Sequence, residues 1–152
     1  MRKLKKMLEE HEGKRDYAYT DMNGKWHIGI GRNIDADGGL GLSEDEIDML
    51  LDNDIVRIMR ELAAEFKWFA KLDEVRADAL IQISFNLGHT RLRKFVKALG
   101  AMESAIELGD DTYFQIAKIE FLDSLWSTQV GKRAVTLATM IETGKYPDGY
   151  DS

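Results

Sequence analysis

The sequence predicts an α+β protein that is mostly helical, with one small β-hairpin close to its N-terminus. Two alternating apolar segments, 16–20 and 25–30, flank an Asn23-Gly24 pair, which is the strongest short-range hairpin signal and typical of a type I′ turn. After residue 43, apolar residues recur at helical spacing, and glycines separate the segments. The 152 residues are 44% hydrophobic and 32% charged, which suits one globular domain with a buried core.

The first helix is expected over 2–10, where Leu4, Met7 and Leu8 lie on one face. Gly13 should end it, because glycine takes the left-handed conformation at little steric cost. The segment 33–42 is rich in Asp and Gly, and we expect a loop with at most a final extended piece.

A long helix is expected over 43–62. Ser43 and Glu46 form a capping box, in which the Ser side chain accepts from the third helical N–H and the Glu side chain reaches back to the cap. Neither Gly nor Pro interrupts the apolar stripe that follows, which consists of Ile47, Leu50, Leu51, Ile55, Ile58 and Leu62.

The remaining chain is expected to form the helical core. The aromatic segment 66–69 connects to a helix that Asp73 caps and Gly88 ends, and this helix is apolar nearly all round, as in a core. Trp126 is assigned to the core rather than to a binding site. Shorter helices are expected at 91–99, 102–108, 112–121 and 131–142, punctuated by Gly100, Gly109 and Gly144.

The predicted hairpin brings Glu12, Asp21 and His27 near one another. Two carboxylates and an imidazole in one pocket can serve as acid, base and nucleophile. The alternative is structural, since charged residues are mostly exposed and Asp favours turns by bonding its own backbone.

The arrangement of Glu12-Gly13, Asp21, His27 and the run 28–31, Ile-Gly-Ile-Gly, resembles the active-site region of the phage-type lysozymes, the T-even phage endolysin family (glycoside hydrolase family 24). The resemblance implies that Glu12 is the general acid and that Asp21 holds or activates the hydrolytic water. A Thr usually stands in the family where this chain has His27. Arg32 matches the His or Arg that follows the family's Gly-x-Gly, and we expect it to contact substrate.

The resemblance continues over nearly all 152 residues. The run 85–88, Phe-Asn-Leu-Gly, is similar to the buried helix end at the floor of the family's substrate cleft, and 91–99 is similar to the basic segment after it. Trp126, Gln129 and Arg133 keep the spacing of a family Trp, a sugar-contacting Gln and an Arg that positions the catalytic Glu.

Aromatic faces and amides suit sugar rings and N-acetyl groups, so we expect four side chains of the helical part to line the cleft. Phe85 could equally be a core residue. The four candidates are Gln82, Phe85, Asn86 and Gln129.

The family fold is a lysozyme-like single domain over 1–152 with two lobes. These are a hairpin lobe with the connecting helix, 13–60, and a helical lobe, 1–12 plus 61–152. The implied activity is that of an endolysin-type muramidase, which hydrolyses the β-1,4 bond between N-acetylmuramic acid and N-acetylglucosamine in peptidoglycan and causes lysis of the bacterium.

His27 leaves two alternatives open, because neutral imidazole can accept a proton from water or attack the anomeric carbon directly. Nucleophilic attack would change the product anomer from inverted to retained or give a transglycosylase-like variant. A catalytically silent wall-binding protein of the same fold is the non-enzymatic alternative, since fold alone does not establish function.

Other classes of site have little support in the sequence. Cysteine is absent, and the three histidines do not have the spacing of a zinc motif, so we expect neither a metal site nor a cofactor. The net charge of −6 and the lack of a continuous basic stripe argue against nucleic acid. Basic residues at 2–15 and 89–97 are either solvated helix faces or a rim that attracts peptidoglycan carboxylates. We expect the protein to bind glycan strands as a monomer.

The N-terminus is basic but lacks the apolar stretch of a signal peptide, and no segment reaches membrane-spanning length. We therefore expect no membrane insertion. We also expect synthesis in the host cytoplasm and release to the wall through a holin, or delivery in a virion.

Overall fold

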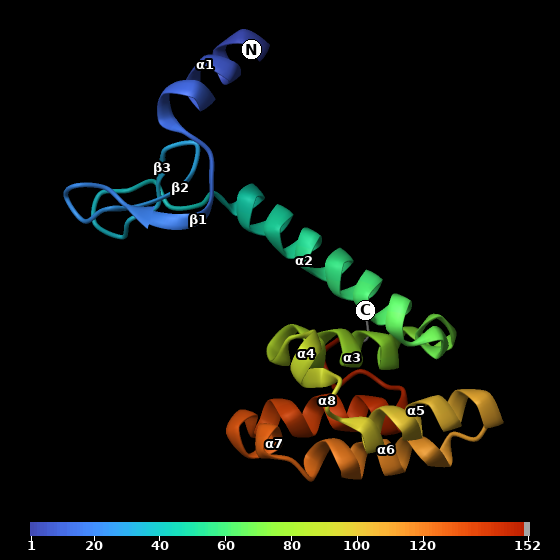
Figure 1. Cartoon of the computed structure of the whole chain (residues 1–152). Coiled ribbons are helices and arrows are strands. Elements are labelled where there is room, and N and C mark those ends of the chain that lie inside the picture. The colour runs from blue at the N-terminus through green and yellow to red at the C-terminus, as the bar shows by residue number, and fades with distance from the viewer. Residues whose placement is uncertain (151–152) are drawn as a thin grey trace. The chain divides into compact units, whose positions relative to one another are not determined.

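The computed structural model describes residues 1–150 and divides into two units, Met1–Leu51 and Asp52–Ser152 (Figure 1). The boundary between the units falls inside one continuous helix, α2 (Glu44–Glu65). The assignment of residues 1–12 to the helical lobe stays a prediction. None of the helices within the described residues is long and apolar enough to cross a membrane.

The first unit contains α1 (Arg2–Glu12) and an antiparallel sheet in the order β1 (Arg15–Thr20), β2 (Trp26–Gly29), β3 (Arg32–Asn33). The predicted helix and hairpin are confirmed. The short strand β3 lies in a segment expected to begin a loop, because two residues are too few to show a strand period. Its pairing makes β2 the central strand, so the side chains of β2 have neighbours on both sides.

The hairpin turn differs from the expected type I′ turn, in which both central residues have positive φ. In this turn Gly24 has a positive φ of 77°, but Asn23 does not. Within residues 1–150, every residue with a positive φ is a glycine. The N–H of Gly24 donates to the carbonyl of Asp21 (3.0 Å), and the Asp21 carboxylate accepts from the N–H of Asn23 (2.8 Å) and of Lys25 (3.0 Å). The Asp21 side chain therefore stabilises the turn through hydrogen bonds to its backbone. The Asn-Gly pattern predicts the turn type from the two central residues alone and takes no account of such bonds.

The helix α2 begins with the predicted capping box. The N–H of Ser43 donates to Oε1 of Glu46 (2.9 Å), and the N–H of Glu46 donates to Oγ of Ser43 (3.3 Å). The helix ends at Glu65, three residues beyond the predicted end.

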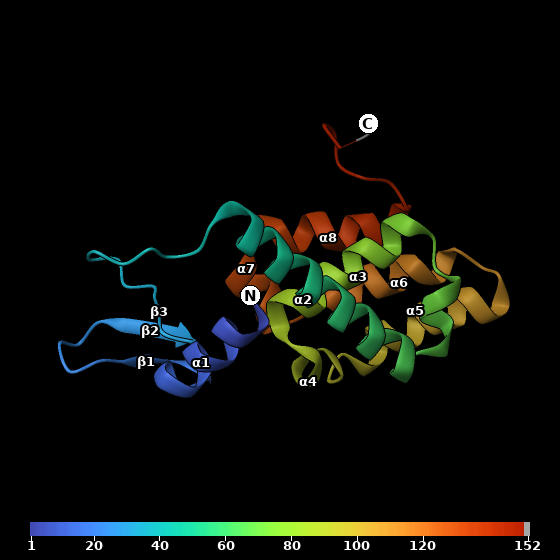
Figure 2. The same ribbon diagram turned by 90° about the horizontal axis from the view of Figure 1, so that it is seen from above.

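The second unit holds the apolar core, to which the end of α2 contributes Ile58 and Leu62. The other elements of the core are η1 (Lys67–Lys71), α3 (Glu74–Leu87), α4 (His89–Leu92), α5 (Val96–Leu108), α6 (Thr112–Leu122), α7 (Leu125–Val130) and α8 (Lys132–Thr143). Helix α6 packs against both α5 and α8, and α8 packs against α3 (Figure 2). Leu80, Phe114 and Phe121 are among the fully buried side chains, and Trp126 belongs to this core, as predicted.

Two helix boundaries of this unit were predicted wrongly. Gly100 does not separate two helices, because α5 runs through it, while the break lies earlier, at 93–95. The cost of glycine in a helix is about 1 kcal/mol, which the burial of Ala98, Leu99 and Met102 outweighs. Helix α7 was not predicted, since six residues give too short a pattern.

Arg76 is a buried charged side chain that ties α3 to the end of α8. Its guanidinium donates to the carbonyls of Ile141 (2.6 Å) and Glu142 (3.0 Å). These carbonyls lie in the last turn of α8, where no further helical N–H is available to donate to them. It also lies 3.9 Å from the centroid of the Phe114 ring.

Candidate active site

Glu12 is the last residue of α1, and its carboxylate lies against the backbone of Gly31. Gly13 follows with φ 78° and donates its N–H to the carbonyl of Glu9 (2.9 Å), which ends the helix as predicted. A Cβ added to Gly31 would lie only 3.0 Å from Oε2 of Glu12, and Gly31 itself has φ 70°. The absence of a side chain at Gly31, the second glycine of the Gly-x-Gly run, therefore leaves space for the Glu12 carboxylate.

Asp21 is the centre of the hydrogen bonds at the hairpin turn. One oxygen, Oδ1, accepts from two backbone N–H groups of the turn, and the other, Oδ2, lies 2.9 Å from Nε2 of His27. The N–H of Lys25, followed by His27, holds the pKa of the Asp21 carboxyl below its usual value of 3.8. Asp21 is therefore ionised at neutral pH.

His27 lies in β2, and the predicted contact with Asp21 is present. An ionised carboxylate only accepts hydrogen bonds, so Nε2 of His27 must carry the proton in this pair. In the neutral ring, Nδ1 then has the free lone pair. The imidazole can thus act as a base through Nδ1 while Asp21 stabilises the positive charge it acquires.

Arg32 connects β3 to the start of α2. Its Nη1 donates to the carbonyl of Gly41 (3.1 Å) and to Oε1 of Glu46 (2.8 Å). Arg32, with a smaller contribution from Ser43, lowers the pKa of Glu46 from 4.5 to about 2. The substrate contact expected of Arg32 stays a prediction, and this structural role was missed because the two partners are fourteen residues apart.

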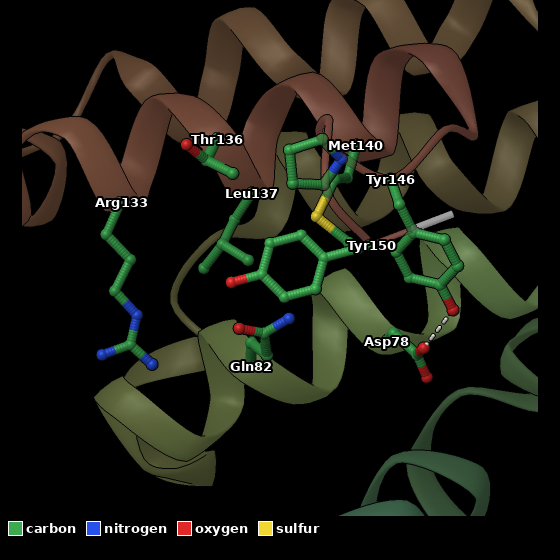
Figure 3. Close-up of a pocket in the computed structure, with 9 residues that line it drawn as sticks. Asp78, Gln82, Arg133, Thr136, Leu137, Met140, Tyr146 and Tyr150 are labelled. Atoms are coloured by element: carbon green, nitrogen blue, oxygen red, sulfur yellow. Dashed lines mark hydrogen bonds between the residues drawn. The ribbon is translucent and has the colours of Figure 1, made fainter. Parts of the chain in front are cut away.

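Gln82 and Arg133, two candidates of the second unit, line one pocket of about 390 Å³ (Figure 3). Arg133 extends from α8 toward α3, and Gln82 points from α3 toward α8. The hydroxyl of Tyr146 donates to Asp78 at one end of the pocket, and this bond raises the pKa of Tyr146 to about 12. The pocket is completed by Thr136, Leu137, Met140, Pro147 and Tyr150.

The contribution of the chain's tail to this pocket was not predicted. Tyr146 and Tyr150 were assigned no role, although tyrosine, which has an apolar ring and a polar hydroxyl, is enriched at interfaces. Their contribution depends on contacts across more than sixty residues, as in the bond from Tyr146 to Asp78.

Phe85 is exposed rather than buried in the core. Its side chain is 46% exposed and lines a second pocket of about 380 Å³. The other residues around this pocket are Asp54, Arg57, Ile58, Glu61, Ser84, Gly88 and His89. An exposed aromatic ring beside polar groups is compatible with sugar binding.

Asn86 and Gln129 differ in their surroundings. Oδ1 of Asn86 accepts from Nε1 of Trp126 (2.8 Å), so this amide also has a structural partner in the core. Gln129 is exposed on α7. Their expected contacts with sugar stay predictions.

The basic block around residue 89 contains an ion-pair cluster that the sequence did not predict. Glu65, at the end of α2, pairs with both His89 and Arg93. Within residues 1–150, no three His, Cys, Asp or Glu side chains are grouped so that they could hold a metal ion.

Comparison with known proteins shows the family of this chain. The family model described as phage lysozyme matches residues 9–111, which is more than half of the chain. A protein of Dictyostelium discoideum named "Probable T4-type lysozyme 2" is 26% identical over 167 aligned residues, covering 93% of this chain and 94% of the relative.

Proposed function

Since the chain belongs to the phage lysozyme family and is thus a lysozyme-type cell wall hydrolase, we propose that it cuts the β-1,4 bond between N-acetylmuramic acid and N-acetylglucosamine in peptidoglycan. The observation that carries this proposal is the pairing of Asp21 with His27 on a sheet whose β2–β3 turn brings Gly31 beside the Glu12 carboxylate. Glycoside hydrolysis needs an acid for the leaving oxygen and a second group that activates water.

Glu12 is the general acid in this proposal. It gives its proton to the glycosidic oxygen as the bond to the anomeric carbon breaks, and the sugar acquires oxocarbenium character. The ionised Asp21 stabilises that positive charge and keeps the His27 ring in place.

His27 is the base toward water. Nδ1 takes a proton from the water, whose oxygen attacks the anomeric carbon, and the imidazolium later passes the proton through solvent to the Glu12 carboxylate. One water is consumed, and one reducing end and one free hydroxyl are formed. Direct attack by Nδ1 on the anomeric carbon is the alternative, which would retain the anomer or transfer the sugar to another acceptor.

The second unit supplies the candidate glycan contacts. Gln82 and Arg133 share one pocket, and Phe85 exposes its ring in another, so amide, guanidinium and aromatic groups are available for N-acetylated sugars. Asn86, Gln129 and Arg32 are proposed to add contacts, and Arg133 is proposed to position the acid. No cofactor takes part.

The biological setting that we propose is an endolysin, made in the host cytoplasm and active as a monomer on the wall after release. It would contact neither nucleic acid nor membrane. Lysis of the bacterium would follow from loss of glycan strands.

The experiment that tests the proposal is the clearing of purified Gram-negative peptidoglycan by the wild-type chain and by Glu12→Gln. We expect the substitution to lower the rate by about 10²–10⁴-fold, as for loss of a general acid. Glu10→Gln is the matched control, because Glu10 is an exposed carboxylate of the same helix. Circular dichroism checks that all three proteins are folded.

Three results would contradict parts of the proposal. A folded wild-type protein that binds the wall without clearing it would indicate the silent wall-binding alternative. Equal clearing by wild type and Glu12→Gln would show that the acid is another residue. If NMR of fresh product shows a retained anomer, or if mass spectra show lengthened oligosaccharides, His27 acts as the nucleophile and not as the base.

A further inference from the structure

The face of the sheet around His27 carries an aromatic stack that the proposed chemistry does not yet use. In the β1–β2 pairing, Tyr19 is directly opposite His27, so both side chains lie on the same face. Their ring centroids are 5.6 Å apart and their planes differ by 25°, which is a stacked arrangement. The Arg15 guanidinium lies 4.8 Å from the centroid of the Tyr19 ring.

The register of β1 explains how Arg15 reaches the ring. Arg15 pairs with Gly29 and Tyr19 pairs with His27, so β1 uses four residue steps where β2 uses two, and an irregularity in β1 takes up the difference. Such a bulge bends a strand and re-aims its side chains. Gly29, opposite Arg15, offers no side chain that would compete for the position.

The imidazole of His27 is therefore restrained in two directions. Asp21 holds its Nε2 edge at 2.9 Å, and the Tyr19 ring covers one face. An Asp alone would leave the ring free to tilt about the hydrogen bond, whereas a stacked ring opposes that motion. The His27 side chain keeps 17% of its surface exposed.

We infer that Tyr19, supported by Arg15, is a positioning residue for His27: it fixes the plane of the imidazole so that Nε2 stays on Asp21 and Nδ1 is presented to the reacting water. This role rests on the proposed function, in which His27 is the base. Tyr19 does not touch the reacting atoms, and its phenol hydroxyl has no part in the proton transfer.

The test compares Tyr19→Leu, which removes the aromatic face, with Tyr19→Phe, which keeps the ring and removes only the hydroxyl. We expect Tyr19→Phe to retain kcat within about twofold. We expect Tyr19→Leu to lower kcat by about 10- to 100-fold with a smaller change in KM, because a catalytic group displaced by about 1 Å can cost a factor of 10². Arg15→Gln should give a decrease smaller than that of Tyr19→Leu.

NMR of the proteins without substrate gives a readout that is independent of activity. The ¹⁵N shifts of neutral wild-type His27 should show a protonated Nε2 and a bare Nδ1. Three-bond couplings from the Hβ protons to ring atoms report χ2, which sets the plane of the imidazole. They should show one χ2 rotamer of His27 in the wild type and Tyr19→Phe, and averaged rotamers in Tyr19→Leu.

The inference is overturned if His27 keeps a single rotamer in Tyr19→Leu or if wild-type Nδ1 carries the proton. It is also overturned if an active Tyr19→Leu retains the wild-type kcat. If the wild type is folded but does not clear peptidoglycan, the proposed function fails, and the rotamer couplings alone then decide whether Tyr19 positions His27.

Discussion

The two units of this protein are stabilised by different kinds of contact. No residue of 1–51 is buried, and the side-chain hydrogen bonds of this unit join residues at most fourteen positions apart, as from Arg32 to Glu46. The unit 52–152 has an extended apolar core, and some of its polar links join residues more than sixty positions apart, as from Arg76 to Ile141. The proposed acid and base lie in the first unit. Substitutions there should thus affect activity first, and substitutions in the second unit should affect stability first.

The largest loss of stability is expected from Arg76→Leu. The substitution leaves the carbonyls of Ile141 and Glu142 without their donor and removes the cation from the Phe114 ring. A buried acceptor left without its donor costs about 1–3 kcal/mol, and two carbonyls are affected here. Urea denaturation followed by circular dichroism measures the change in the free energy of unfolding.

Arg57→Leu is the control for Arg76→Leu. Arg76 pairs with Asp73, three residues before it, at 3.0 Å, and Arg57 pairs in the same way with Asp54 at 2.8 Å. The Arg57 side chain, however, is 60% exposed, against 11% for Arg76. An exposed pair contributes about 0–1 kcal/mol. Similar losses from the two substitutions would mean that the long-range hydrogen bonds of Arg76 do not stabilise the second unit.

The next largest effect is expected from Asn86→Leu. Nε1 of Trp126 would lose its acceptor inside the core, which costs about 1–3 kcal/mol. The double variant Asn86→Leu with Trp126→Phe removes both polar partners and should recover part of the coupling in a double-mutant cycle. Purely additive losses would show that the bond contributes nothing to stability, and a fall in activity beyond the loss of folded protein would support the expected sugar contact of Asn86.

The same division between near and distant partners decides what the sequence could predict. The capping box of Ser43 and Glu46, the helix end at Gly13 and the contact of Asp21 with His27 depend on residues within six positions of one another, and all were predicted. The hairpin was also predicted, because a short turn joins its two strands. The helix through Gly100 was not, because packing of its neighbours outweighs the propensity of one glycine.

Distant partners explain the parts of the candidate site that the sequence missed. The bond from Tyr146 to Asp78 joins residues 68 positions apart, and the pair of His89 with Glu65 joins residues 24 positions apart. No local period connects such positions, so neither the tyrosine side of the Gln82 pocket nor the contact of His89 with Glu65 could be derived. The type of the turn at Gly24 was predicted wrongly, and the reason there is not a distant partner. The hydrogen bonds of the Asp21 side chain compete with the intrinsic preference of Asn-Gly for a type I′ turn.

A moderate effect is expected from Ser43→Ala at the start of α2. The Ser hydroxyl is the acceptor for the N–H of Glu46, and loss of such a cap costs about 1 kcal/mol. Ser43→Asp keeps an acceptor at the same place and should retain the wild-type free energy of unfolding. Equal losses in the Ala and Asp variants would indicate that the hydroxyl acts through its donated bond to Glu46 instead.

The smallest effect is expected in the acid stability of the first unit, through Glu46. Arg32 and Ser43 lower the pKa of this carboxyl from 4.5 to about 2, so the folded protein favours the charged form more than the unfolded chain does. Its contribution to stability is thus fully present above pH 4.5 and is lost as the pH falls toward 2. The lowered pKa of Asp21 acts in the same direction.

Because Glu46 is partly exposed, solvent screening keeps this contribution small, so titration is a sharper measurement than unfolding. The chemical shift of the Glu46 carboxyl carbon, followed by NMR from pH 6 to pH 2, should keep the value of the ionised carboxylate until close to the lower limit. In Arg32→Gln the midpoint should rise toward 4.5, because the strongest of the interactions that favour the carboxylate is gone. A wild-type midpoint near 4.5 would mean that Arg32 does not hold the start of α2 in solution. The first unit would then have lost the longest of its polar links, and its stability would depend on the hairpin hydrogen bonds around Asp21.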